Sequence, residues 1–529
     1  MRRNRLIRLL LILLPAAASA PACAGDWLQF GYDAAHSSSN PQGGYTLPSG
    51  NAFVTGFSAT GVALSSSTDS SPVLATGIVT ASGTKDLLFI EAKNGTLLAL
   101  DASNGAQVWS QRPNTQLAPP SSGLASLSTG SPAIDAAKQY IYHYGNDGAI
   151  HKYAIGTGVE VTGSGWPELS TYKPEVEKGA GALSIASTPS GTFLYSITDG
   201  YVGDAGDYQG HLTTINLATG TQKVFNSLCS NLAIHFIKNG TTSGGGQNDC
   251  SSRQNGIWGR PGAIYDAGTN RVFISTGNGP YNASTGGFNW GDSVLALNPD
   301  GSGNGTPGMP VDSYTPTTFQ NLQNTDADLG SVSVALVPAP AGTAASYQHL
   351  GVQPGKDGCV RLINLADMSG NAAPAHTGGE LSALNLPGGS NCASGGDSPE
   401  IKPQPAVWVN PSDGSTWIYV VSYANGMASY KIVLDGSGVP SLAQQWAVTD
   451  MQGGSGTSPV ISGGQMYYFS GGRVVVRDAL TGASIWTSSA LSSIHWQSLI
   501  VQNGRIYAID GASKLIEWQL DGIFRSPFE

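Results

Sequence analysis

The chain repeats one short pattern of strands and turns along most of its 529 residues. In its clearest form, DLLFIEAKNGTLLALDASNGAQVWSQ, runs of alternating apolar residues are separated by the turns Asn94-Gly95 and Asn104-Gly105. Asn-Gly between two alternating runs is typical of a β-hairpin. Eight copies of the pattern can be recognised, and they begin at DLLFI, QYIYH, FLYSI, RVFIS, HLGVQ, WIYVV, QMYYF and RIYAI.

One copy of a few short strands cannot bury both of its faces alone, so neighbouring copies must cover them. A closed ring of such copies also leaves no long exposed strand edge. The repeats therefore predict an all-β fold, an eight-bladed β-propeller of four-stranded antiparallel blades. We expect residues 25–529 to form this single domain and the segment DWLQFGYDAAHSSSNP to help close the ring.

The composition supports a turn-rich β protein. Glycine accounts for 71 residues and charged residues for only 11%, whereas helix-rich proteins carry many Glu, Lys and Arg residues on their helices. The hydrophobic share of 40% is sufficient for a large core and argues against global disorder. The net charge of −10 and the scattered basic residues argue against nucleic acid as a partner, because no basic face is available for phosphates.

The first residues, MRRNRLIRLLLILLPAAASAPACAGDW, combine a basic start, a short apolar run and a group of small residues. This order is typical of a Sec signal peptide and not of a membrane span. We expect residues 1–24 to be removed, which leaves a periplasmic or secreted protein that begins at Gly25. The alternative is a lipoprotein anchored at Cys23, although Ala-Pro-Ala before this cysteine is a poor lipobox.

Four cysteines follow the signal segment, an even number as expected in an exported chain. Cys229 and Cys250 bracket a Gly- and Asn-rich stretch, where a disulfide would restrict an otherwise mobile insertion. Cys359–Cys392 is the remaining pairing. The sequence contains no Cys-x-x-Cys-His motif, so we expect no covalently attached haem, and no Cys and His spacing fits zinc.

The stretch NGTLLALDASNGAQVW resembles the repeat of quinoproteins, which bind pyrroloquinoline quinone (PQQ), and DWLQFGYDAAHS resembles the usual start of such chains. The resemblance covers essentially the whole chain after the signal segment. It implies the propeller fold but leaves the function open, because the same repeat builds both PQQ-dependent dehydrogenases and cofactor-free scaffolds such as outer-membrane assembly lipoproteins.

In the enzymes of this family, PQQ lies on the propeller axis beside a Ca²⁺ ion held by oxygen ligands. The resemblance implies two metal ligands, Asn278 in STGNGP and Asp204 in GYVGDAGDYQG, with Asp207 as a substitute for Asp204. Glycines on both sides of Asn278 let the backbone approach a ligand closely. The alternative for both segments is ordinary turn formation, in which Asp and Asn order Gly-rich loops.

The resemblance also implies three cofactor-binding residues. Trp258 in GIWGRPGAIYD matches the tryptophan on which the quinone stacks, and Lys356 in PGKDGCV matches the basic residue beside the quinone carbonyl. Asp69 in STDSSPV is a shorter acid where the family has a Glu near the cofactor. The alternatives are a Trp packed between blades, a solvated turn lysine and a structural aspartate.

Asp326 in QNTDADLGS lies where the family places its catalytic Asp, which takes the hydroxyl proton as a general base. The Asp-Leu-Gly ending also occurs in non-catalytic relatives. The chain departs from the enzymes because it lacks adjacent cysteines, has STGSPAID where an Arg is common in the second copy, and lacks an Asn-Trp in the sixth. Members similar to polyvinyl alcohol dehydrogenase tolerate some of these losses.

The resemblance therefore implies a PQQ- and Ca²⁺-dependent dehydrogenase that oxidises a small or polymeric alcohol and passes electrons to a separate acceptor. The alternative is a cofactor-free propeller that binds a protein partner in the periplasm or cell envelope. A sugar-binding lectin is a third interpretation, based on Trp and Asn residues in loops. The first two differ in whether acidic and Asn residues of different copies converge on the axis.

Overall fold

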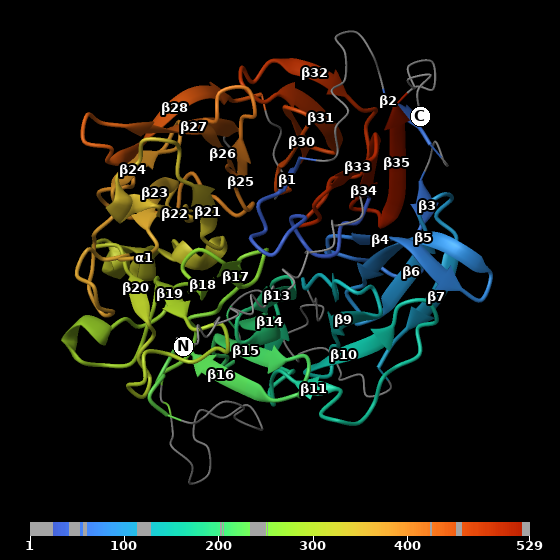
Figure 1. Ribbon diagram of the computed structural model, residues 1–529, viewed down its shortest axis with the longest axis horizontal. Coiled ribbons are helices and arrows are strands. Elements are labelled where there is room, and N and C mark those ends of the chain that lie inside the picture. The colour runs from blue at the N-terminus through green and yellow to red at the C-terminus, as the bar shows by residue number, and fades with distance from the viewer. Residues whose placement is uncertain are drawn as a thin grey trace, which may run out of the picture.

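The computed structural model describes residues 25–41, 53–56, 61–113, 129–201, 204, 206–232, 250, 252–423, 426–450 and 457–520. Within these ranges, eight sheets follow one another in chain order around a ring, which Figure 1 views down the short axis of the molecule. The predicted eight-bladed β-propeller is confirmed. The predicted signal peptide, residues 1–24, lies outside the described residues.

The first four blades are built from strands that are consecutive in the chain. The first contains β4 (Val73–Thr80), β5 (Gly83–Glu91), β6 (Leu97–Asp101) and β7 (Gln107–Gln111). The second contains β8 (Ala133–Ile134), β9 (Tyr140–Tyr144), β10 (Ala149–Ala154) and β11 (Glu168–Leu169). The third contains β12 (Glu177–Gly179), β13 (Ser184–Thr188), β14 (Gly191–Gly200), β15 (His211–Asn216) and β16 (Gln222–Asn226). The fourth contains β17 (Ile264–Asp266), β18 (Arg271–Ser275), β19 (Val294–Leu297) and β20 (Asp312–Tyr314).

The other four blades continue this order around the ring. The fifth contains β21 (Ala335–Pro338), β22 (His349–Gln353), β23 (Cys359–Asn364) and β24 (Ser382–Asn385). The sixth contains β25 (Ala406–Val409), β26 (Thr416–Val421), β27 (Met427–Leu434) and β28 (Pro440–Val448). The seventh contains β29 (Val460–Ser462), β30 (Gln465–Ser470), β31 (Arg473–Asp478) and β32 (Ser484–Thr487). The eighth contains β33 (Ile500–Gln502), β34 (Arg505–Ile509) and β35 (Lys514–Leu520).

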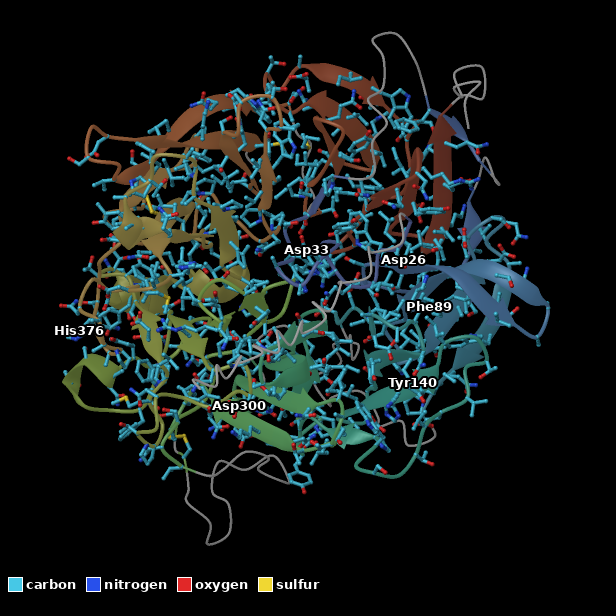
Figure 2. All side chains as sticks on the ribbon, viewed as in Figure 1. Asp26, Asp33, Phe89, Tyr140, Asp300 and His376 are labelled. Atoms are coloured by element: carbon cyan, nitrogen blue, oxygen red, sulfur yellow. A yellow bond between two sulfur atoms is a disulfide. The ribbon has the colours of Figure 1, made fainter. Side chains whose placement is uncertain are left out.

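The N-terminal part of the chain closes the ring. Strand β2 (Phe53–Thr55) pairs antiparallel with β35 and gives the eighth blade its fourth strand, and β3 (Val62–Ala63) pairs with the same strand. Strand β1 (Ser39–Asn40) adds to the seventh blade, parallel to β29. Figure 2 shows Asp33, which precedes β1, near the middle of the ring and His376 at its rim.

Apolar side chains join each blade to both of its neighbours. In β18, Val272 packs with Phe193 and Tyr195 of the third blade, whereas the next residue, Phe273, packs with Ile363 of the fifth. Successive side chains of a strand point to opposite faces of its sheet, so one strand serves two interfaces. The alternating runs of the repeat are therefore buried on both faces.

A tryptophan near the end of the repeat fixes one blade to the next. The indole Nε1 of Trp109 in β7 donates to the carbonyl of Ile155 at 3.0 Å, and its ring covers Gly158, where a Cβ atom would lie 2.8 Å from the ring. In the sixth blade, Trp446 donates to the carbonyl of Ala479 at 3.1 Å and covers Gly482 in the same way. The repeated glycine is therefore required by this contact.

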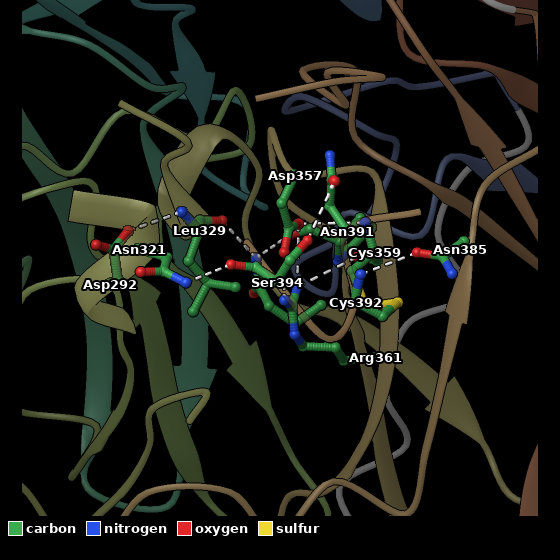
Figure 3. Close-up of polar contacts among 12 residues, drawn as sticks. Asp292, Asn321, Leu329, Asp357, Cys359, Arg361, Asn385, Asn391, Cys392 and Ser394 are labelled. Carbon is green, nitrogen blue, oxygen red and sulfur yellow. Dashed lines mark hydrogen bonds and ion pairs between the residues drawn. A yellow bond between two sulfur atoms is a disulfide. The ribbon is translucent and has the colours of Figure 1, made fainter. Parts of the chain in front are cut away.

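Helices are few in the described part of the chain. They are α1 (Phe319–Thr325) and three 3-10 helices, η1 (Ala283–Thr285), η2 (Leu329–Ser331) and η3 (Ala345–Tyr347). None of the described helices has the length and apolar character needed to cross a membrane. Both predicted disulfides, Cys229–Cys250 and Cys359–Cys392, are present, with Cα atoms 5.9 and 4.9 Å apart, and Figure 3 shows the second of them.

Candidate functional site

A cavity of about 350 Å³ is lined by segments that adjoin the first six blades and the eighth. Because only the middle of a ring brings together segments from so many blades, this cavity lies on the propeller axis. A separate groove of about 880 Å³ borders the N-terminal segment and blades four to seven, and none of the predicted site residues lines it.

All six residues singled out in the sequence border this axial cavity. They are Asp69, Asp204, Trp258, Asn278, Asp326 and Lys356. Asp207, the substitute for Asp204, does not line it; its carboxylate instead lies 3.9 Å from the ammonium of Lys173. The roles of the six residues remain predictions, but the structure brings them together.

Strand topology explains why residues so far apart in sequence meet here. Asp69, Trp258 and Asp326 precede the first strands of their blades, whereas Asn278 and Lys356 follow the second strands. In an antiparallel pair the start of one strand lies beside the end of the other, so both kinds of segment emerge on the same face of the ring.

The segment that begins Thr-Gly-Asn-Gly interlocks with the Asp-Leu-Gly segment of the fifth blade. The backbone N–H of Asn278 donates to the carboxylate of Asp328, and a Cβ atom on Gly277 would lie 2.6 Å from that carboxylate. A Cβ atom on Gly330 would lie 2.4 Å from the backbone of Thr276. Both glycines are thus required by close approach. The side-chain amide of Asn278 makes no hydrogen bond with any described residue and lines the cavity.

Lys356 joins the two aspartates of the Asp-x-Asp segment. Its ammonium forms an ion pair with Asp328 and lies 3.4 Å from Oδ1 of Asp326. Burial lowers the pKa of Lys356, but attraction by Asp328 and Asp326 outweighs this effect and raises the pKa well above its usual value. The ammonium also lies 5.3 Å from the ring centre of Trp258. Lys356 is therefore a fixed positive charge on the cavity wall.

The acidic side chains of the cavity repel one another. Partial burial raises the pKa of Asp326, whose side chain remains open to the cavity, and repulsion by Asp328 and Asp204 adds to the rise, although Lys356 opposes it. Burial also raises the pKa of Asp199, in β14, to about 7, against the attraction of Lys178. The hydroxyl of Tyr208 donates to Asp204 at 2.7 Å. The cavity therefore favours an added cation, a proton or a metal ion.

Two tryptophans and an arginine also line the cavity. The rings of Trp258 and Trp496 meet edge to face, with centres 6.2 Å apart. The guanidinium of Arg260 donates to the backbone carbonyls of Thr129, Asp69 and Trp496 at 2.7–2.8 Å. Since these carbonyls precede the second, first and eighth blades, Arg260 ties three blades together at the cavity wall.

Asp69 occupies a buried position beside this arginine and carries two partners of its own. Its carboxylate lies 2.9 Å from the ammonium of Lys93 and 3.2 Å from Nδ1 of His495. Burial would raise the pKa of Asp69, but hydrogen bonds and attraction from His495 and Lys93 lower it overall. Asp69 is therefore held on the cavity wall by Lys93 and His495.

Sequence reasoning missed several residues that line the same cavity. They are Lys178, Asp199, Arg260, Asp328 and Trp496. Asp328 and Arg260 stand two residues from Asp326 and Trp258, inside the segments QNTDADLGS and GIWGRPGAIYD, but the resemblance gave them no role. Lys178 and Asp199 carry no comparable signal, because they become neighbours only through the pairing of β12 with the end of β14.

Comparison with known proteins supports the repeat and the fold. The PQQ-repeat family model described as outer membrane protein assembly factor BamB matches residues 50–231, which include the first three blades. Sequence comparison with curated proteins gives no match.

Solved structures of similar shape cover nearly the whole chain. Quinohemoprotein alcohol dehydrogenase from Comamonas testosteroni has a TM-score of 0.61 and 16% identity over 96% of this chain and 82% of its own. ADHIIG, a quinohemoprotein alcohol dehydrogenase from Pseudomonas putida HK5, has a TM-score of 0.60 and 15% identity over 96% of this chain and 81% of its own. A europium-containing methanol dehydrogenase has a TM-score of 0.58 and 15% identity over 93% of this chain and 89% of its own.

At these identities the likeness establishes the fold and leaves the activity to be argued from the site. The predicted resemblance is confirmed at that level: residues 50–231 match a PQQ-repeat family model, and the chain shares its fold with solved quinohemoprotein alcohol dehydrogenases.

Proposed function

We propose that this chain is a dehydrogenase that binds PQQ and Ca²⁺ in the axial cavity and oxidises an alcohol. The observation that carries the proposal is the convergence of Asp204, Asn278 and Asp326 with the other predicted residues, contributed by four different blades, on one cavity. Burying charged and polar groups costs free energy unless they are paired. A cofactor-free scaffold gives no reason to gather such groups on its axis.

The cavity suits a planar, anionic cofactor. Its volume of about 350 Å³ lies within the usual range of small-molecule sites. Trp258 and Trp496 supply aromatic surface, Lys356 would lie beside the quinone carbonyl, and Lys178 and Arg260 add positive charge to the wall of the cavity. PQQ, when bound, supplies a quinone that accepts hydride from the alcohol.

Asp326 is the proposed general base. Its side chain is 64% exposed at the cavity, so an alcohol can reach its carboxylate from solvent. The raised pKa increases its basicity, while Lys356 holds the carboxylate in place. Asp326 would take the hydroxyl proton as the carbon–hydrogen bond of the alcohol loses its hydride.

Asn278 and Asp204 are the proposed Ca²⁺ ligands. No group of three His, Cys, Asp or Glu residues in the described part of the chain is arranged to hold a metal ion without further ligands. The free amide of Asn278 and the mutual repulsion of the acids nevertheless suit a hard cation, provided that cofactor oxygen atoms complete its coordination. We therefore expect Ca²⁺ to bind together with PQQ and weakly without it.

Reconstitution tests the proposal. Purified mature protein is incubated with PQQ and Ca²⁺, freed of unbound cofactor, and assayed for retained PQQ and for alcohol-dependent reduction of a dye. We expect about one PQQ per chain and dye reduction that requires an alcohol. Absence of retained PQQ would contradict the proposal.

Asp326→Asn separates chemistry from binding. Loss of a general base lowers turnover by about 100-fold or more, whereas PQQ retention is unchanged because Asn has nearly the same shape. Wild-type turnover in this variant would remove Asp326 from the mechanism.

A second candidate is a cofactor-free propeller that binds a protein in the cell envelope. The match of residues 50–231 to the family model described as outer membrane protein assembly factor BamB favours it. Failure of the wild-type protein to retain PQQ would leave this candidate standing. For both candidates we propose export through the signal peptide at residues 1–24, with the mature protein in the periplasm or outside the cell.

A further inference from the structure

Four cationic side chains line the axial cavity, and they differ in whether a carboxylate already pairs with them. Lys356 pairs with Asp328 and Asp326, and Lys402 lies 2.6 Å from Glu400. Lys178 and Arg260 make no ion pair with any carboxylate in the described part of the chain.

Of these two cations, Lys178 has the fewer polar contacts. It lies in β12, directly opposite Asp199 of β14 in the strand register, and only 6% of the residue is exposed. Its ammonium lies 5.8 Å from the ring centre of Tyr201 and, within the described residues, makes neither a hydrogen bond nor an ion pair. Burial lowers the pKa of Lys178, and Asp199 and Asp69 only partly offset this effect.

Arg260 adds a second positive charge beside Lys178. The two cations are close enough for Arg260 to lower the pKa of Lys178 by repulsion. Burial lowers the pKa of Arg260 itself to about 10. Three backbone carbonyls hold its guanidinium in place, but neutral carbonyls do not cancel its charge.

A lysine kept only for stability would have a carboxylate partner, because a buried ammonium without one is strongly unfavourable. Lys178 instead faces a cavity that a ligand can enter, beside a second cation whose position is fixed. An anion placed there would gain from both charges and would relieve their repulsion.

We propose that Lys178, supported by the charge of Arg260, forms an anion subsite that binds a carboxylate of the ligand in the axial cavity. The inference rests on the proposed function for its first ligand, a carboxylate of PQQ. It assigns this contact to residues of the third and fourth blades, whereas the second copy of the repeat has STGSPAID where related enzymes commonly place an arginine. A carboxylate on the substrate is the other source of the same chemistry.

The test compares wild type, Lys178→Met and Lys402→Met by calorimetric binding of two probes. The first is PQQ with Ca²⁺ in excess, and the second is isophthalate, a planar dicarboxylate, with its uncharged diamide as the matched control. Methionine keeps the length and apolar stem of lysine, so both variants are expected to fold. Lys402→Met removes a lysine of the same cavity whose charge Glu400 already neutralises.

We expect Lys178→Met to bind PQQ and isophthalate about 10- to 100-fold more weakly than wild type, as is typical for the loss of a charge-assisted hydrogen bond. Lys402→Met should stay within about 3-fold of wild type, and the diamide should bind no variant better than another. If only isophthalate binds, and does so through Lys178, the anion subsite stands for a substrate carboxylate and the PQQ proposal fails. Equal binding of both probes by wild type and Lys178→Met overturns the subsite while leaving PQQ binding intact, and binding of neither probe by wild type overturns both proposals.

Discussion

Two buried cations of the propeller occupy opposite electrostatic situations. Arg361 in β23 lies inside the fifth blade against Asp357, and their side chains are 2% and 0% exposed (Figure 3). Lys178 lies at the axis and is also buried, but no carboxylate of the described residues forms an ion pair with it. Attraction by Asp357 outweighs burial and raises the pKa of Arg361, whereas burial lowers the pKa of Lys178.

The difference in pairing distinguishes a charge that stabilises the fold from a charge that is available to a ligand. A paired charge inside a blade completes the packing of that blade, and its removal leaves an uncompensated partner. A buried charge without an ion pair, such as that of Lys178, destabilises the ligand-free protein, and the cost is relieved only when an anion binds beside it. Removing each charge should therefore have opposite effects on stability.

Asp357→Ala is expected to have the largest effect. It leaves the buried guanidinium of Arg361 without its partner and should lower the free energy of unfolding by about 3–5 kcal/mol. Lys178→Met should change it by less than about 1 kcal/mol or increase it. Denaturant unfolding followed by tryptophan fluorescence measures both variants.

The double variant Asp357→Ala with Arg361→Met is the matched control for this prediction. It removes both charges together and should recover most of the lost stability. If Lys178→Met destabilised the protein as strongly as Asp357→Ala, Lys178 would be a structural residue and the contrast between the two cations would fail.

Asp199→Asn tests the electrostatics of the axial cavity through the pH dependence of the free energy of unfolding. The pKa of Asp199 is raised to about 7, mainly by burial, whereas an Asp in an unfolded chain has a pKa of about 3.9. The folded protein therefore keeps a proton that the unfolded chain has lost, and this contribution to stability is complete below about pH 4 and lost as the pH rises through about 7.

Asparagine does not titrate, so the free energy of unfolding of Asp199→Asn should rise relative to wild type between about pH 4 and 7 and level off above that. Unfolding measured at several pH values gives this difference directly. If this difference in the free energy of unfolding did not vary with pH, attraction by Lys178 would fully offset the burial of the Asp199 carboxylate. Lys178 would then act as an ion-pair partner, as Arg361 does for Asp357.

The smallest effect is expected at the surface. Lys223 forms an ion pair with Asp300, but its side chain is 53% exposed. Solvent and salt screen such pairs, so Lys223→Ala should cost less than about 1 kcal/mol. A cost as large as that of Asp357→Ala would show that burial does not govern the effect of ion pairs in this propeller.

The sequence predicted the parts of this structure that repeat or that carry local motifs. Alternating strands and Asn-Gly turns were enough for the eight blades, and the cysteine positions were enough for both disulfides. Trp258, Asn278 and Lys356 could be placed on one cavity because each lies in a recognisable segment of its repeat copy.

Long-range pairing accounts for what the sequence did not reveal. The short strand β12 has no signal beyond the letters EKG, yet its pairing with β14 places Lys178 opposite Asp199. In the same way, nothing near Ser39 or Phe53 indicates that β1 joins the seventh blade and β2 the eighth. Such contacts depend on ring closure, which is a property of the whole chain.

In the proposed site, the axial cavity binds an anionic cofactor through Lys178, a lysine that no carboxylate of the described residues pairs with. The most direct measurement is the increase in the free energy of unfolding that saturating PQQ and Ca²⁺ give to wild type and to Lys178→Met. At a PQQ concentration about 100-fold above the dissociation constant of wild type, we expect a gain of about 2.7 kcal/mol for wild type and only about 0.4–1.4 kcal/mol for Lys178→Met, whose affinity is about 10- to 100-fold lower. No gain for wild type, or the same gain for both proteins, would contradict the account.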